Sequence, residues 1–118
     1  MTVLCDFNQI IGDTPKTVAP TSGSAEVPLP DFNSGGRESG ATSLIMCSVR
    51  NLGGSASVRV NGNDVGSLTA TPGTTWITQL VALNGSNLNN GNNEIVLRNV
   101  TDEFQIKDVM CFFHQSDT

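Results

Sequence analysis

The chain of 118 residues is long enough for one domain with a two-layer core and too short for two domains. Only 14% of its residues are charged, while twelve Gly, twelve Asn and many Ser and Thr favour turns and pleated surfaces, so the composition indicates an all-β protein rather than a helical one. A formal net charge of −5 with six scattered Lys and Arg argues against nucleic acid as a partner, and apolar runs no longer than VMCFF argue against a membrane span.

Residues 2 to 11 (TVLCDFNQII) are predicted to form a first strand with Val3, Cys5 and Phe7 on one face. This start has no basic region, and Asp6 interrupts any apolar signal core. We therefore expect no secretory signal and a protein that stays in the cytoplasm, unless a signal precedes this sequence.

Residues 12 to 42 are rich in Pro, Gly, Ser and Thr, and GGRESG at 35 to 40 is typical of a loop. The segment is predicted to be an extended N-terminal loop of the single domain 1–118. Because structureless connections of thirty residues are uncommon, a short strand is expected inside it, near 25 to 29.

Alternating apolar residues predict strands at 43 to 51 and in SASVRV, where Ala56, Val58 and Val60 share one face. Asn61-Gly62 adopts positive φ at little cost and predicts a tight hairpin turn. A short return strand is then expected at 65 to 68.

The next strand is predicted to begin near Trp76, and it is followed by an irregular Asn-rich loop, 84 to 93, anchored by Leu88. A strand then follows in EIVLRNV, with Ile95 and Leu97 on one face. The last strand, EFQIKDVMCFF, is predicted to alternate strictly, and its end is apolar on both faces, which favours a central position in the sheet.

About eight short antiparallel strands in one domain predict a two-sheet β-sandwich. The order VRVNGNDVG, TWITQ, LNNGNNEIVL and FQIKDVMCFF, within residues 56 to 113, resembles the galactose-binding-domain-like jelly-roll superfamily, whose second half often shows V-N-G, G-x-N-x-I and F-x-I-x-D-V. The resemblance implies an antiparallel jelly roll of the kind found in carbohydrate-binding modules, adhesion domains, and accessory domains of enzymes and virions.

Sugar-binding faces usually present an aromatic plane, and Trp76 is the sole Trp of a chain without Tyr. Core or edge packing is the alternative interpretation of Trp76. The amides of the Asn-rich loop are the other candidate glycan ligands, although such residues are also common in tight turns. The candidate ligand-binding residues are Trp76, Asn84, Asn87, Asn89 and Asn90.

The resemblance also places Asp108 where related carbohydrate-binding modules often carry a structural Ca²⁺ ligand. Calcium needs six to eight oxygen ligands, and no DxDxD-type cluster is present, so Asp108 is the weak candidate and no cofactor is otherwise expected.

Cys5, Cys47 and Cys111 lie in strand-like apolar runs and are predicted to be reduced, buried thiols, although paired terminal strands would allow a disulfide. His114 is the only histidine, and no nucleophile in a recognisable motif accompanies it. We therefore expect no enzymatic activity.

Two functions remain. The first is a structural or assembly protein, such as a capsid decoration or fibre component of a virus particle, which forms a homo-oligomer or lattice through the loops 12 to 42 and 84 to 93. Its candidate contact residues are Phe32, Arg37 and Asn92. The alternative is a carbohydrate-binding module or lectin that recognises glycans through the loops at one end of the sandwich.

Overall fold

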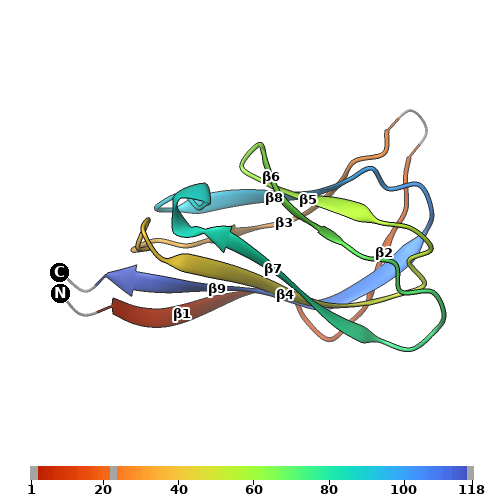
Figure 1. The fold of residues 1–118 in the computed structure, drawn as a ribbon, viewed down its shortest axis with the longest axis horizontal. Helices are drawn as coiled ribbons and strands as arrows, with labels where there is room; N and C mark the ends of the chain where they lie inside the picture. The colour runs from red at the N-terminus through yellow and green to blue at the C-terminus, as the bar shows by residue number, and fades with distance from the viewer. Residues whose placement is uncertain (1–2, 22–23, 117–118) are drawn as a thin grey trace.

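The computed structural model describes residues 3–21 and 24–116, which form an antiparallel two-sheet jelly-roll sandwich (Figure 1). One sheet has the order β1-β9-β4-β7, with β2 also paired to β9, and the other has the order β3-β8-β5-β6. The predicted all-β fold is confirmed, and the expected last strand, β9, is central in its sheet. The strands are β1 (Val3–Ile11), β2 (Lys16–Val18), β3 (Val27–Asn33), β4 (Thr42–Arg50), β5 (Ala56–Val60), β6 (Asn63–Leu68), β7 (Ile77–Asn84), β8 (Asn92–Arg98) and β9 (Phe104–Ser116), with a 3-10 helix, η1, at Gly85–Asn87.

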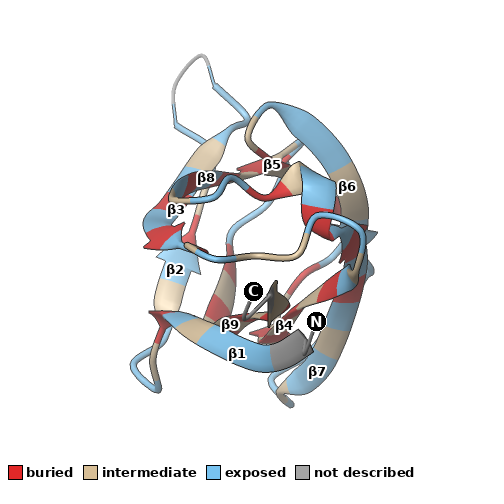
Figure 2. Ribbon diagram, turned by 90° about the vertical axis from the view of Figure 1, so that its left-hand side faces the viewer, coloured by how far each residue is buried: buried red, intermediate tan, exposed pale blue. Residues whose placement is uncertain are grey.

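The core lies between the two sheets, where alternate residues of the strands point inward (Figure 2). Ala56, Val58 and Val60 of β5 are buried as predicted, and so are Ile95 and Leu97 of β8. This alternation follows from the two-residue repeat of a strand, which sends successive side chains to opposite faces. Within the described residues, no helix is long and apolar enough to cross a bilayer.

The hairpin between β5 and β6 has the geometry that its sequence predicts. Asn61 and Gly62 have φ values of 51° and 87°, and Val60 pairs directly with Asn63. Two consecutive residues with positive φ make a type I′ turn, whose twist matches that of the flanking strands.

The predicted strict alternation of the last strand is wrong at Asp108. Phe104 and Ile106 point inward, but beyond Asp108 the buried residues are Val109 and Cys111. Asp108 has a φ of 52°, and the register between β9 and β4 shifts there, which defines a β-bulge. The extra residue of a bulge moves every later side chain to the opposite face.

The segment 12 to 42 contains more regular structure than the predicted extended loop. β2 pairs with β9, and β3 is longer than the short strand expected near 25 to 29. β3 includes Pro28 and Pro30, and it lies at the edge of its sheet, where a residue without an N–H is tolerated.

The prediction that all three cysteines are buried is wrong for Cys5. Cys47 and Cys111 are buried, but Cys5 is exposed, and all three thiols are free, so none forms a disulfide. Cys5 and Phe7 lie on the outer face of β1, opposite His114 and Phe112 of β9. Phe7 is 53% exposed, so it lies at the surface and not in the core.

Candidate functional site

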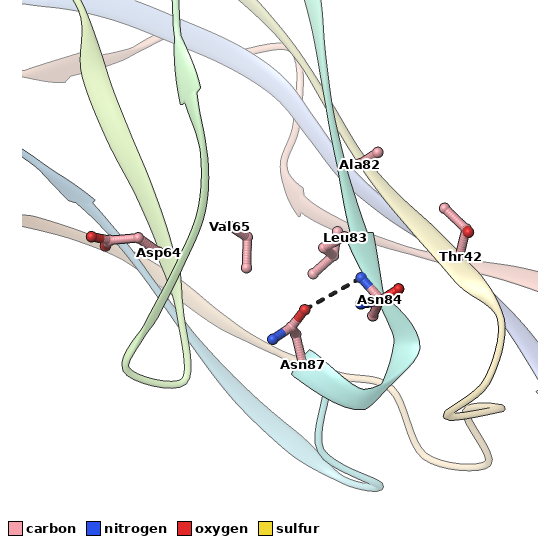
Figure 3. Close-up of a pocket in the computed structure, with 7 residues that line it drawn as sticks. All are labelled: Thr42, Asp64, Val65, Ala82, Leu83, Asn84 and Asn87. Atoms are coloured by element: carbon pink, nitrogen blue, oxygen red, sulfur yellow. Dashed lines mark hydrogen bonds between the residues drawn. The ribbon is translucent and has the colours of Figure 1, made fainter.

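An open cleft of about 390 Å³ lies between β6 and β7, the edge strands of the two sheets (Figure 3). Away from the cleft, the line along which β6 and β7 meet is closed by Gln79 of β7 and by Thr69, which follows β6. The Gln79 side-chain oxygen accepts a hydrogen bond from the Thr69 N–H (2.8 Å), and the Gln79 side-chain amide donates one to the Thr69 carbonyl oxygen (3.0 Å). The space between β6 and β7 is therefore closed at Gln79 and open near Asn84. The cleft is lined by Thr42, Asp64, Val65, Ala82, Leu83, Asn84 and Asn87.

The helix η1 fixes the floor of the cleft. Its buried first residue, Gly85, donates its N–H to the carbonyl oxygen of Ala41 at 2.7 Å. A Cβ at this position would collide with the carbonyl oxygen of Glu38, so only glycine allows η1 to pack against this loop. The side-chain oxygen of Asn87 accepts a hydrogen bond from the backbone N–H of Asn84 at 3.3 Å.

The cleft combines amide groups with an apolar wall. The side-chain N–H groups of Asn87 donate to none of the described residues, so they are available to a ligand. Val65 and Leu83 face each other across the space between the strands, whereas the carboxylate of Asp64 points away from it (Figure 3). Asp64 instead pairs with Arg59 (3.2 Å) and Arg98 (3.5 Å).

The rest of the Asn-rich loop is held by internal hydrogen bonds. Asn93 is fully buried, and its amide oxygen accepts from the Asn89 N–H (2.7 Å) and the Asn61 side chain (2.9 Å). The Asn89 side chain donates to the carbonyl oxygen of Asn92 at 2.9 Å, and the side-chain oxygen of Asn90 accepts from the N–H of Gly36 at 2.6 Å. Of the predicted ligand residues, Asn84 and Asn87 therefore line the cleft, and Asn89 and Asn90 shape the loop beside it.

The predicted contact residues also take part in intramolecular packing. Phe32 is only 5% exposed, so it belongs to the core and offers no surface contact. Arg37 donates from Nε to the carbonyl oxygen of Leu88 at 2.7 Å, and Asn92 donates to Asp31 at 3.1 Å. Arg37 thus connects the loop after β3 to the Asn-rich loop, and Asn92 connects that loop to β3 itself.

Trp76 lies at the opposite end of the sandwich from the cleft, because β7 runs between Trp76 and Asn84. At about 3.3 Å per strand residue, the two are separated by roughly 26 Å. The Trp76 ring centroid lies 4.5 Å from Cζ of Arg50 and 4.8 Å from Nζ of Lys107. The predicted set of ligand residues is thus divided between two separate places.

Asp108, the candidate calcium ligand, is the residue with positive φ in the β-bulge of β9. Its backbone N–H donates to the carbonyl oxygen of Gly12 at 2.9 Å. Over the described part of the chain, no group of three or more His, Cys, Asp and Glu side chains gathers around a common point.

The sequence did not predict Thr42, Asp64, Val65, Ala82 and Leu83 as lining residues. The Asn61-Gly62 turn and the strand that follows it were recognisable, but nothing in the sequence pairs that hairpin with β7. The cleft arises from the approach of two edge strands that belong to different sheets.

Comparisons with known proteins agree with this fold. Neither the scan against family models nor the search of curated proteins found a match. Among solved structures, a sugar-binding protein, the EclA C-terminal domain, matches with a TM-score of 0.54 and 12% identity over 94% of this chain and 79% of its own. The CBM36-1 domain of a multidomain xylanase from the hindgut metagenome of Trinervitermes trinervoides matches with a TM-score of 0.56 and 12% identity over 92% of this chain and 95% of its own.

A virus structure, that of infectious bursal disease virus strain Gt, matches with a TM-score of 0.49 and 9% identity over 96% of this chain and 32% of its own. This likeness is too low to carry an argument about function. The likeness to the EclA and CBM36-1 domains agrees with the predicted jelly-roll fold.

Proposed function

We propose that this chain is a carbohydrate-binding domain without catalytic activity and that its ligand occupies the cleft between β6 and β7. The observation that carries the proposal is the amide group of Asn87, directed beside the apolar pair Val65 and Leu83 in a space of about 390 Å³. Two structural neighbours are described as sugar-binding or carbohydrate-binding domains, which supports the same function.

The chemistry of the cleft suits a neutral sugar. A sugar ring has hydroxyl groups that need donors and acceptors, and C–H faces that pack on apolar side chains. Asn84, Asn87 and Thr42 supply amide and hydroxyl groups, while Val65, Ala82 and Leu83 supply apolar contacts. The volume is within the usual range for small-molecule sites, roughly 300 to 1,000 Å³.

The test is Asn87→Asp. This substitution keeps a side-chain oxygen for the Asn84 N–H but removes the amide donors, so it separates ligand binding from the support of η1. For a glycan found by array screening, calorimetry should show binding weakened by about tenfold or more, since hydrogen bonds from a site to its ligand are worth about 1 kcal/mol or more each. The exposed neighbour Ser86, which does not line the cleft, provides the control Ser86→Ala. Equal affinity of Asn87→Asp and the natural chain would place the sugar elsewhere.

A second function, assembly with further copies of the chain, is favoured by a separate observation. The outer face of β1, β9, β4 and β7 carries two adjacent rows of side chains that run across all four strands. The row Phe7, Phe112, Leu44 and Ala82 is entirely apolar, and in the row Gln9, Met110, Met46 and Leu80 only Gln9 is polar. We name these eight residues the apolar stripe.

The apolar stripe is unusual for a sheet that faces water, because outward residues of an antiparallel sheet are normally polar. Leu80 is 61% exposed and Phe7 is 53% exposed. A hollow of about 280 Å³, lined by Cys5, Leu44, Phe112 and His114 among others, adjoins the stripe. Contiguous exposed apolar surface of this kind marks interaction sites. Assembly in a virus particle, the finer form of this function, stays a prediction, and the mass of the native protein in its source material tests it.

A further inference from the structure

Two cations gather around the sole tryptophan. Arg50 is the last residue of β4, Lys107 lies on the neighbouring strand β9, and Trp76 immediately precedes β7 on the other side of β4. Their charged groups lie 4.5 Å and 4.8 Å from the centroid of the Trp76 ring. In a chain with a net charge of −5, two of the six Lys and Arg residues therefore meet at one aromatic ring.

Among the described residues, the guanidinium of Arg50 is hydrogen-bonded through Nε and not through its two terminal nitrogens. Its Nε donates to the side-chain oxygen of Gln105 at 3.2 Å, and Asn51 donates to the same oxygen at 2.6 Å. The two terminal nitrogens donate to none of the residues described in the structure. Two terminal N–H groups in one plane match the two oxygens of a carboxylate.

The positive charge at this end of the sheet is poorly neutralised. Of the described carboxylates, only Asp13 contacts either cation, at 3.5 Å from Nζ of Lys107, and its side chain is 93% exposed. An ion pair with such an exposed group contributes little. By contrast, Arg59 and Arg98 on the other sheet are paired with Asp64 and Glu26.

We propose that Arg50, Lys107 and Trp76 form a second binding site, which takes the carboxylate of an acidic sugar. Arg50 and Lys107 bind the carboxylate, and the Trp76 ring holds the two cations in place through cation–π contacts. The choice of a sugar rests on the proposed function, but the site itself is separate from the cleft and lies at the other end of β7.

The site provides its own spectroscopic probe. Because the chain has one Trp and no Tyr, tryptophan fluorescence reports on Trp76 alone. The natural chain would be titrated at low ionic strength with a trimer of galacturonic acid, with the matched neutral trimer of galactose, and with sodium acetate. We expect a saturable change with the acidic trimer only, and weaker binding as salt is added.

Matched variants assign the response to the two cations. Arg50→Gln and Lys107→Gln should each weaken binding of the acidic trimer by about tenfold or more, because each variant loses a charge-assisted hydrogen bond to the carboxylate. Arg59→Gln removes a cation of the other sheet and should bind the acidic trimer as the natural chain does. No saturable change, an equal response to acetate, or an unchanged affinity of Arg50→Gln would overturn the proposal.

Calorimetry that measures the binding of neutral sugars distinguishes the acidic-sugar site at Trp76 from the proposed sugar site in the cleft. If neutral sugars bind in a manner sensitive to Asn87→Asp while Trp76 does not respond to the acidic trimer, the second site is wrong and the cleft stands. If Trp76 responds in an Arg50-dependent manner and no neutral sugar binds, the acidic-sugar site stands and the cleft proposal fails.

Discussion

At the scale of single residues, Asn93 connects more segments than any charged group in the described structure. Its side-chain amide is fully buried and donates to the Phe32 carbonyl oxygen (3.3 Å), the Ser34 hydroxyl (2.7 Å) and the Gly91 carbonyl oxygen (3.1 Å). It also accepts from Asn61 and from the Asn89 N–H, so one residue joins the β5–β6 turn, the loop after β3 and the Asn-rich loop.

We predict that Asn93→Ala lowers the free energy of unfolding by about 2 to 4 kcal/mol, because several buried polar groups lose their partner at once. Urea unfolding followed by tryptophan fluorescence measures this change. Asn92→Ala is the control, since Asn92 is exposed and, among the described residues, its side chain donates only to the exposed Asp31. A similar, small loss for both variants would contradict the structural role of Asn93.

The three thiols should differ in reactivity. Burial raises the pKa of Cys47 and of Cys111 from 9.0 to about 12, whereas Cys5 is exposed. Since the thiolate is the reactive form, we predict that one thiol, Cys5, reacts with a disulfide reagent in the folded protein at pH 8. All three should react in denaturant. The variant Cys5→Ser should leave no rapidly reacting thiol, and a rapid reaction in that variant would show that Cys47 or Cys111 is accessible.

The raised pKa values also predict a loss of stability in alkali. Above pH 9 the thiols of the unfolded chain release their protons, whereas those of Cys47 and Cys111 stay protonated in the folded protein up to about 12. The unfolded state then binds fewer protons, so stability falls as pH rises through this window, by about 1.4 kcal/mol per pH unit for each thiol. Urea unfolding at pH 8 and pH 10 measures the fall, which should be smaller in the double variant Cys47→Ala/Cys111→Ala.

At the scale of elements, the β5–β6 hairpin positions Val65 in the cleft and depends on its turn. We predict that Gly62→Ala costs about 1 kcal/mol or more of stability, because Gly62 has a φ of 87° that a residue with a Cβ adopts at a cost. Gly54→Ala is the matched control, since its added Cβ has no atom within 4 Å and its φ is not positive. Thermal unfolding of both variants measures the difference, and equal midpoints would mean that this turn geometry is not required.

The elements that could be predicted from the sequence are those with a regular pattern. β4, β5 and β8 alternate cleanly, and the Asn61-Gly62 turn has one favoured geometry. β2 was missed because its three residues are too few to show a period, and β3 was underestimated because its prolines normally interrupt strands. The bulge at Asp108 could not be seen, since its positive φ is imposed by the pairing of β9 with β1 and β4.

At the scale of the whole molecule, the candidate site was predicted only in part. Asn84 and Asn87 could be identified because the Asn-rich loop is visible in the sequence. Val65 lines the cleft only because β6 lies beside β7 in the folded chain. Gly66 allows that approach, because a Cβ there would lie 2.7 Å from Cγ1 of Val81. Contacts between edge strands of different sheets leave no period in the sequence, so they could not be predicted.

The molecule separates three kinds of surface. The cleft with its neutral amides lies beside η1 and the β5–β6 hairpin, whereas the cations around Trp76 lie just before the start of β7. The two ends of β7 lie toward opposite ends of the sandwich (Figure 1). The apolar stripe crosses the outer face of the five-stranded sheet between these ends. Only Ala82 belongs to both the cleft and the apolar stripe, so sugar binding at the ends and assembly through the remaining face are compatible in one molecule.

The apolar stripe leads us to predict that two copies of the chain associate. Four strands about 4.8 Å apart, with about nine residues of about 3.3 Å each, give the outer face roughly 600 Å². This area approaches the roughly 800 Å² that each partner contributes to a standard interface. The outer sheet face can pack on the same face of a second copy around a two-fold axis, with the apolar stripe at the centre and polar residues at the rim.

We therefore predict that the chain is a concentration-dependent dimer in solution and that Leu80→Lys or Phe7→Lys converts it to a monomer of 12.4 kDa. Burial of a lysine charge at the centre of an apolar interface is costly, whereas the same side chain is readily hydrated in the monomer. Size-exclusion chromatography with light scattering measures the mass, and Ser67→Lys, on an exposed position of β6 in the other sheet, should stay dimeric. A natural chain that remains monomeric at every concentration would exclude this dimer, and a dimer unaffected by both substitutions would place the interface elsewhere.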